Sequence, residues 1–240
     1  MSERDPVHDF KNLSVTQHQN NFIKWYYSKI KPYLKGVILE VGSGIGTNSR
    51  LIVRDFRNNK ILLTDFDDRY VENLHKQFGN FKNVSIYKLD LTKKSDIERI
   101  EEYDFAFALN VLEHIRDDKL AVVNLASKMR PNGRIFIQVP AHMFLYNGMD
   151  KAIGHYRRYR KKDIVRLAKS ANLRIAKMYY FNMFSMFGWF LNGAVLGKKS
   201  LDQNLMGTFN KLVPLLRFIE ENLLFNFTGI SLMAVLERKR

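Results

Sequence analysis

The sequence predicts an α/β fold, with a mostly parallel sheet of seven strands and helices on both faces. Short apolar runs alternate with helical patterns from residue 37 onward, which is typical of a parallel sheet covered on both sides. The first apolar run ends in a loop with three glycines, and the last one follows Gly229 after a long aromatic segment. We therefore expect an antiparallel last strand and a helical insertion between strands 6 and 7.

The first half of the chain supplies most of the expected elements. Residues 16–34 carry an apolar stripe at helical spacing, which predicts a helix before the sheet begins. The apolar runs that predict strands are 37–41, 60–64, 84–89, 104–109 and 134–139. Helical patterns fill the intervals at 47–56, 69–78, 95–101 and 117–129, and "PNG" at 131–133 stops the last of them.

The second half is expected to complete the sheet. A polar loop at 140–162 leads to a helix at 162–171, a sixth strand at 174–181 and a final strand at 229–238. Residues 178–197 carry no charged side chain, and three interpretations stay open. They are a buried or dimer-forming insertion, a lid against a membrane surface, and a membrane span. The span is least favoured because Asn182, Ser185 and Asn192 interrupt the apolar run.

The length of 240 residues fits one domain, residues 1–240. Within it we expect an N-terminal helical cap at 1–35 and a core made of 36–182 and 228–240. Residues 183–227 form the aromatic and Met-rich insertion.

Charge and composition limit the function classes. The net charge of +15 favours anionic partners, such as nucleic acid, an anionic membrane or an acidic substrate. A basic surface that only keeps the protein soluble is the alternative. Basic residues concentrate between Lys151 and Lys177, where Asp163 is the one acid. The absence of cysteine excludes disulfides and thiolate metal sites, and we expect no metal. The N-terminal residues lack an apolar leader, so we expect a cytoplasmic protein, with peripheral membrane contact as an option.

The loop "EVGSGIG" at 40–46 predicts a cofactor site at the end of the first strand. A dinucleotide loop requires G-x-G-x-x-G, and Thr47 stands where the third glycine is needed. The spacing is instead acid-x-G-x-G-x-G, from Glu40 to Gly46. Glycines let the backbone approach a zwitterionic amino acid and a ribose, and Glu40 can meet an ammonium group, as S-adenosylmethionine requires. A tight structural turn is the alternative.

Acids also end the next two strands. Asp65 closes the second strand, where a carboxylate can accept both ribose hydroxyls. Asp90 closes the third, placed for an adenine amino group, with Leu91 beside the ring. A lone aspartate after a strand is usually a helix N-cap. Three acids at three successive strand ends favour a ligand site, because open α/β sheets bind ligands at that edge.

Together these segments resemble a known family. "LEVGSGIG", "TDFD", "LDLT", "YDFAFALNVLEHIRDD" and "MRPNGRIFIQVP" are similar, in order and spacing, to class I S-adenosylmethionine-dependent methyltransferases, which have a Rossmann-like fold. The "LEH" segment resembles the subgroup that includes quinone-biosynthesis methylases. The resemblance is strong over residues 36–140. The chain departs from the family in the long insertion and in the helix after the second strand, which lacks the usual small residues.

The resemblance implies S-adenosyl-L-methionine as cofactor and S-adenosyl-L-homocysteine as product. It places cofactor contacts at Glu40, Gly42, Ser43, Gly44, Gly46, Asp65, Phe66, Asp90, Leu91, Asn110 and Val111. It also makes the helix around Tyr26 and Tyr27 a cap over the methionine end of the cofactor.

The candidate catalytic residues are His114, His155 and Tyr156. His114 follows the fourth strand, near the expected methyl group, and orientation of the loop is its alternative role. His155 or Tyr156 is a candidate general base if the loop after the fifth strand folds over the site. The segment "GHYRRYRKKD" resembles a subset of methyltransferases associated with glycan, lipid or natural-product assembly.

The residues predicted to bind substrate are Arg157, Arg158 and Tyr159. Arginine forks bind phosphates and carboxylates bidentately, and a solvated cap on the next helix is the alternative. With the apolar insertion they favour a small or lipid-like, anionic acceptor methylated at oxygen or nitrogen. RNA methylation, or a non-catalytic cofactor-binding or assembly role, are the alternatives. We expect the acceptor, a second copy or a membrane as partner, and nucleic acid is less favoured.

Overall fold

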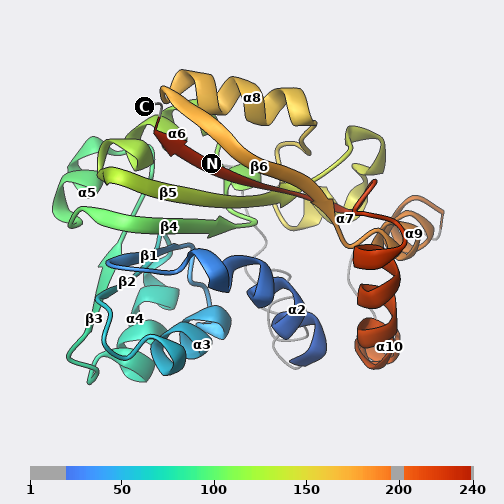
Figure 1. Cartoon of the computed structure of the whole chain (residues 1–240), viewed down its shortest axis with the longest axis horizontal. Helices are drawn as coiled ribbons and strands as arrows, with labels where there is room; N and C mark the ends of the chain where they lie inside the picture. The colour runs from blue at the N-terminus through green and yellow to red at the C-terminus, as the bar shows by residue number, and fades with distance from the viewer. Residues whose placement is uncertain (1–19, 196–202, 239–240) are drawn as a thin grey trace.

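The computed structural model describes residues 20–195 and 203–238, which are built around one seven-stranded sheet (Figure 1). The strand order is β3-β2-β1-β4-β5-β7-β6. The strands are β1 (Ile38–Val41), β2 (Ile61–Asp65), β3 (Val84–Lys88), β4 (Tyr103–Leu109), β5 (Met129–Pro140), β6 (Leu173–Phe181) and β7 (Ser231–Arg238). β7 runs antiparallel to β5 and β6, and the other neighbouring pairs are parallel. The predicted fold class is confirmed.

Helices cover both faces of the sheet (Figure 1). One face packs against α5 (Lys94–Arg99), α6 (Asp118–Ser127) and α8 (Lys161–Ser170). The other face packs against α2 (Asn20–Ile30), α3 (Thr47–Asp55) and α4 (Asp68–Phe78). Every residue of β1 and β2 is buried, which explains why both strands are apolar runs without polar alternation.

Two segments differ from the sequence-based expectation. β5 begins at Met129, whereas the prediction placed its start at residue 134. The pairing with β4 jumps from Tyr103↔Met129 to Phe105↔Arg134, so the "PNG" residues bulge out of the ladder and Pro131 breaks no strand bond. The expected loop at 140–162 also contains the 3₁₀ turn η3 (Met143–Leu145) and the helix α7 (Gly148–Ala152).

The insertion between β6 and β7 is helical, as predicted. It contains α9 (Phe184–Trp189), the π-helical turn η4 (Phe190–Val195) and α10 (Gln203–Asn222), while residues 196–202 lie outside the described chain. None of the described helices is long and apolar enough to cross a bilayer. The division into cap, core and insertion stays a prediction, and residues 1–19 of the expected cap lie outside the described chain.

Polar contacts fix α10 against the rest of the fold. The indole Nε1 of Trp25 on α2 donates to Glu221 Oε1 at 2.7 Å. Glu220 is completely buried, and its two carboxylate oxygens accept the backbone amides of Asn182 and Met183 at 2.6 and 2.8 Å. A buried carboxylate whose oxygens both accept hydrogen bonds fixes the position of the segments that donate to it. The insertion therefore leaves β6 in a defined direction and packs along α2.

Candidate active site

The glycine loop lies between the carboxyl end of β1 and the start of α3. Gly42, Gly44 and Gly46 have φ values of 72°, 54° and 81°, which favour glycine over other residues. Gly42 also lies against the segment after β4, because a Cβ atom at this position would come within 2.6 Å of Val111 Cγ2. The loop is therefore close to Val111 and, next along the chain, to η2 (Leu112–His114).

Glu40 is the buried acid of this loop. It is 2% exposed, and its Oε2 accepts a hydrogen bond from Ser49 Oγ at 2.6 Å. Burial raises the pKa of Glu40 to about 8, against the opposing effect of the Ser49 bond. A carboxyl group held in a low dielectric gains most from a nearby cation, so this position suits the ammonium group of S-adenosylmethionine.

Asp65 lies beside the same loop. Its Oδ2 accepts the Gly44 amide at 2.8 Å, and its Oδ1 accepts the Asp67 amide at 3.0 Å. The N-cap of α4 is Asp67, whose side chain accepts from the Arg69 amide, so Asp65 does not have the capping role that a lone aspartate suggests. The carboxylate thus lies at the carboxyl edge of the sheet, against the glycine loop.

The remaining predicted cofactor contacts follow β3 and β4. Asp90 lies after β3, and its Oδ1 accepts from the amide and the hydroxyl of Thr92. Leu91 beside it is buried. Asn110 after β4 is exposed, has a φ of 53° and donates its amide to the Gln138 carbonyl at 2.9 Å. The structure thus places these residues on one sheet edge, with Asp90 two strands away from β1.

The two tyrosines expected in the cap bond to opposite ends of α3. Tyr26 donates to Asn48 Oδ1 at 2.7 Å, at the start of α3. Tyr27 donates to Asp55 at the other end of that helix, at 3.2 Å. Cofactor contacts for the predicted residues, Ser43 and Phe66 included, stay predictions.

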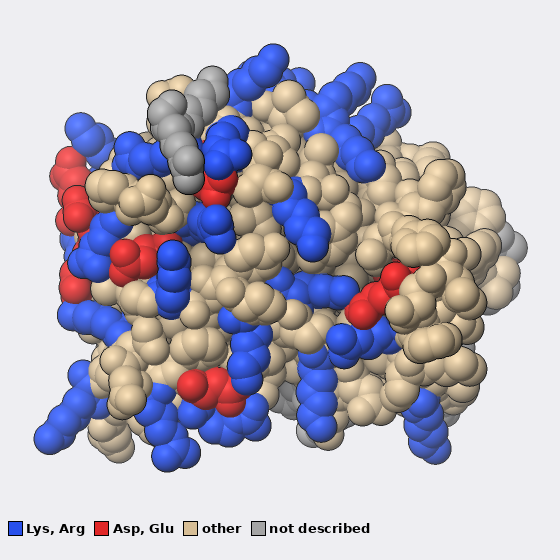
Figure 2. Space-filling view, viewed as in Figure 1, with Lys and Arg blue, Asp and Glu red and all other residues tan. Residues whose placement is uncertain are grey.

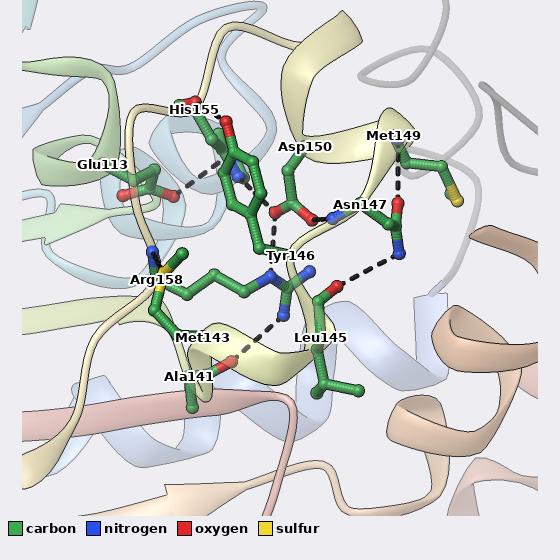
Figure 3. Close-up of polar contacts among 10 residues, drawn as sticks. All are labelled: Glu113, Ala141, Met143, Leu145, Tyr146, Asn147, Met149, Asp150, His155 and Arg158. Atoms are coloured by element: carbon green, nitrogen blue, oxygen red, sulfur yellow. Dashed lines mark hydrogen bonds and ion pairs between the residues drawn. The ribbon is translucent and has the colours of Figure 1, made fainter. Parts of the chain in front are cut away.

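A cluster of ionisable side chains lies between the segment after β4 and the loop after β5 (Figure 3). His155 Nδ1 lies 2.9 Å from Asp150 Oδ1, and its Nε2 lies 3.7 Å from Glu113 Oε1. The ring of His114 meets that of His155 edge to face, with centroids 4.7 Å apart. The loop after β5 thus folds back over the segment after β4, as the candidate catalytic role of His155 requires.

The local sequence explains this arrangement. Asn147 caps α7 and forms a capping box with Asp150, which fixes the aspartate in the first turn of the helix. Gly154, with a φ of 78°, then reverses the chain, and the His155 amide donates to the Asp150 carbonyl at 2.9 Å. The chain reversal therefore places the His155 ring against the Asp150 side chain.

Arg158 binds the same oxygen of Asp150 as His155 does. Its Nε donates to Asp150 Oδ1 at 2.9 Å and its Nη1 to the Ala141 carbonyl at 3.1 Å (Figure 3). Burial alone would raise the pKa of Asp150, but the hydrogen bond from His155 and the charge of Arg158 hold it below its ordinary value. The carboxyl group is therefore an ionised hydrogen-bond acceptor at neutral pH.

The other residues of the "GHYRRY" segment also have partners within the chain. Arg157 pairs with Asp118 at 2.9 Å, and the Tyr159 hydroxyl donates to the same carboxylate at 3.0 Å. The Tyr156 amide donates to the Glu113 carbonyl at 2.8 Å. Contact of these side chains with an acceptor stays a prediction. The buried guanidinium of Arg158 already donates to Asp150 and to the Ala141 carbonyl.

Sequence reasoning missed two members of this cluster, Glu113 and Asp150. The signals available were the position of Glu113 next to His114 and the five-residue spacing of Asp150 from His155. Within the described residues, Glu113, His114 and His155 each offer one ligand atom, and these atoms lie within 4.8 Å of one another. The group could hold a divalent metal ion, where the sequence led us to expect no metal.

Part of the chain matches a known domain type. Residues 39–135 match the family model described as "Methyltransferase domain". A non-reducing polyketide synthase (prhL) of Penicillium brasilianum is 23% identical over 140 residues, which are 56% of this chain and 6% of that protein. The mitochondrial ubiquinone biosynthesis O-methyltransferase of Dictyostelium discoideum is 26% identical over 121 residues, 45% of this chain and 36% of that protein. The chain thus spans only a small part of the length of these relatives.

Solved structures share the fold. A SAM-dependent methyltransferase from Archaeoglobus fulgidus has a TM-score of 0.60 at 14% identity, covering 90% of this chain and 93% of that chain. Coclaurine N-methyltransferase bound to N-methylheliamine and S-adenosylhomocysteine has a TM-score of 0.60 at 12% identity, covering 90% and 72%. Residues 39–135 thus match a methyltransferase domain, and the chain shares the fold of S-adenosylmethionine-dependent methyltransferases. The finer likeness to quinone-biosynthesis methylases stays a prediction.

Proposed function

We propose that the chain transfers a methyl group to an oxygen or nitrogen atom of a small or lipid-like acceptor, with His155 as the general base. The observation that carries this proposal is the 2.9 Å contact between His155 Nδ1 and Asp150 Oδ1. An ionised Asp150 accepts the Nδ1 proton, which fixes the tautomer that carries the ring lone pair on Nε2, the nitrogen able to accept a proton. The same ring borders the segment after β4, which adjoins the glycine loop.

The acceptor proton has a defined destination in this proposal. Bound S-adenosylmethionine supplies an electrophilic methyl group on a sulfonium and leaves as S-adenosylhomocysteine. His155 Nε2 takes the proton of an acceptor hydroxyl as its oxygen bonds to the methyl carbon, or takes a proton from an acceptor ammonium before the resulting amine attacks that carbon. The side chains of Asp150 and Glu113 lie on either side of the resulting imidazolium. Only 7% of the His155 side chain is exposed, which limits proton exchange with bulk water.

The acceptor class is proposed from the surroundings of this cluster. The aromatic insertion supplies an apolar surface beside α7. Of the neighbouring arginines Arg157 and Arg158, Arg157 is the exposed one, with 31% of its side chain accessible to solvent. An apolar body with an anionic group near Arg157 fits both features. RNA is the second candidate acceptor because of the net charge of +15.

The test follows methyl-tritiated S-adenosylmethionine incubated with the protein and a cell extract. Label that S-adenosylhomocysteine competes away from the organic or small-solute fraction supports the proposed acceptor class, and label in RNA contradicts it. His155→Gln should lower the rate about 10²–10⁴-fold at unchanged cofactor affinity. The matched control is His75→Gln, an exposed histidine on α4.

Two results would reassign the histidine. Wild-type turnover by His155→Gln would remove the general-base role. Turnover abolished by EDTA and restored by a divalent ion would assign Glu113, His114 and His155 to metal binding instead.

A further inference from the structure

The end of the molecule formed by α9, η4, α10 and the segment 223–227 exposes an apolar surface. Figure 2 shows few charged side chains over this end, whereas Lys and Arg are frequent over the rest of the same face. We call it the apolar end and define it by its exposed large apolar residues: Phe187, Phe190, Leu191, Leu212, Leu215, Phe218, Leu223, Phe225 and Phe227. Phe225 and Phe227 are the most exposed, at 78% and 83%. Contiguous apolar surface of this kind marks an interaction site.

The elements around the apolar end carry exposed lysines. Lys211 is exposed on α10 itself, Lys24 on α2, which packs against α10, and Lys151 on α7, which packs against η4. These side chains can reach anionic groups at the border of an apolar contact, because a lysine stem lies along apolar surface while its ammonium stays in water.

The acids of α10 do not oppose this positive border. Glu220 is buried, and its carboxylate accepts hydrogen bonds from two backbone amides. Glu221 pairs with Lys29 at 2.7 Å and with Arg217 at 3.0 Å, so its charge is neutralised locally. The described acids of α10 are therefore buried or paired, whereas Lys24, Lys151 and Lys211 are exposed.

Charge also decides between the two occupants that such a surface suits. A second copy of the chain would bring another net charge of +15 against the first, and like charges repel. An anionic lipid surface attracts the same charge, and each basic residue near it adds to the binding. Phenylalanine and leucine side chains insert at the boundary between head groups and acyl chains.

We propose that the apolar end docks the protein peripherally on an anionic membrane, with the exposed Phe and Leu side chains of the insertion inserted into it.

The docked surface is connected to the candidate active site. Trp189 ends α9 between Phe187 and Phe190, and the Arg158 guanidinium lies 4.9 Å from the centre of its ring. Arg158 in turn binds Asp150. Docking would thus bring a membrane next to the cluster, and a lipid-like acceptor could enter from that side. This last step rests on the proposed function, whereas membrane binding itself does not.

The experiment is sedimentation of the purified full chain with lipid vesicles. One set contains phosphatidylcholine alone and the other phosphatidylcholine with phosphatidylglycerol. The test variant is Phe225→Ser with Phe227→Ser. The control is Phe81→Ser, which removes a phenylalanine that is 47% exposed in the segment between α4 and β3, outside the insertion. Circular dichroism checks that each variant is folded.

The expected result is binding to the phosphatidylglycerol vesicles that weakens as salt is added. The double variant should partition about tenfold or more weakly, since each inserted phenylalanine contributes on this scale, while Phe81→Ser should bind like the wild type. No sedimentation with anionic vesicles, or an equal loss in the control, would overturn the proposal. So would a dimer, measured by light scattering, that the double variant dissociates. Sedimentation needs no turnover, so its failure is distinct from failure of the methyl-transfer assay.

Discussion

Arg158 Nε lies 2.9 Å from Asp150 Oδ1, and both side chains are almost completely excluded from solvent. An ion pair in this position gains its stability only while both partners are present, because either charge alone would be buried without compensation. Asp150 also accepts from His155. The pair therefore fixes the carboxylate that orients the histidine, and we interpret Arg158 as a positioning residue.

Replacing Arg158 with Met should destabilise the fold strongly. The substitution leaves the Asp150 charge buried, with an expected loss of about 3–5 kcal/mol in the free energy of unfolding. Arg157→Met is the matched control and should cost about 1 kcal/mol or less, because its pair with Asp118 is partly exposed and screened. Urea denaturation followed by circular dichroism measures both, and equal losses would contradict the assignment.

Asp65 is expected to bind the cofactor. Asp65→Asn removes the charge from the carboxylate beside Gly44, and we expect about ten- to hundredfold weaker binding of S-adenosylhomocysteine. Asp67→Asn is the control, because Asp67 caps α4 and asparagine is an equally good cap. Isothermal titration calorimetry compares the two. Similar affinities in both variants would exclude Asp65 from the cofactor site.

The sheet and its acidic edge were predictable because they depend on local patterns. Glu40 and Asp65 each end an apolar run, and the carboxyl ends of parallel strands meet at one edge. The contact between Asp150 and His155 was not predictable in the same way. It depends on the capping of α7 by Asn147 and on the reversal at Gly154, inside a segment whose polar composition suggests only a loop.

The exposure of the apolar end could also not be predicted from the sequence. An uncharged aromatic stretch is equally consistent with a buried helix and with an interface, since composition does not say which face a helix presents. Packing decides it: Val213 of α10 is buried in the core, whereas Leu212 and Leu215 on either side are about half exposed. The separation between these faces arises only when α10 packs along α2.

Gly42 should tolerate no side chain. Gly42→Ala requires a left-handed conformation at a φ of 72° and places Cβ within 2.6 Å of Val111 Cγ2. The backbone part alone costs about 1–2 kcal/mol. Gly148→Ala is the control, because no atom lies within 4 Å of a Cβ there and alanine favours the helix α7. Thermal unfolding should therefore show a loss in the first variant and none in the second.

A second substitution separates strain from collision at this position. Val111→Ala combined with Gly42→Ala should recover the steric part of the loss and leave the backbone part, so the two changes should not be additive. Additive losses would show that the loop does not pack on Val111. The double variant thus tests the approach of the glycine loop to the segment that carries Glu113 and His114.

Glu40 makes stability depend on pH in a definite direction. Burial raises its pKa in the folded chain to about 8, above the ordinary value of 4.5, so the folded state keeps a proton that the unfolded state releases. The stabilising effect of that proton is complete below about pH 4.5 and is lost as the pH rises through 8.

Glu40→Gln cannot ionise and can still bond to Ser49. Between about pH 5 and 8 the free energy of unfolding of the wild type should therefore fall relative to the variant by about 1 kcal/mol per pH unit. Urea denaturation across this range measures the difference in the free energy of unfolding between the wild type and Glu40→Gln. The other titrating groups are the same in both proteins, so their contributions cancel in this difference. Parallel curves would mean that Glu40 is already ionised at neutral pH in the folded protein.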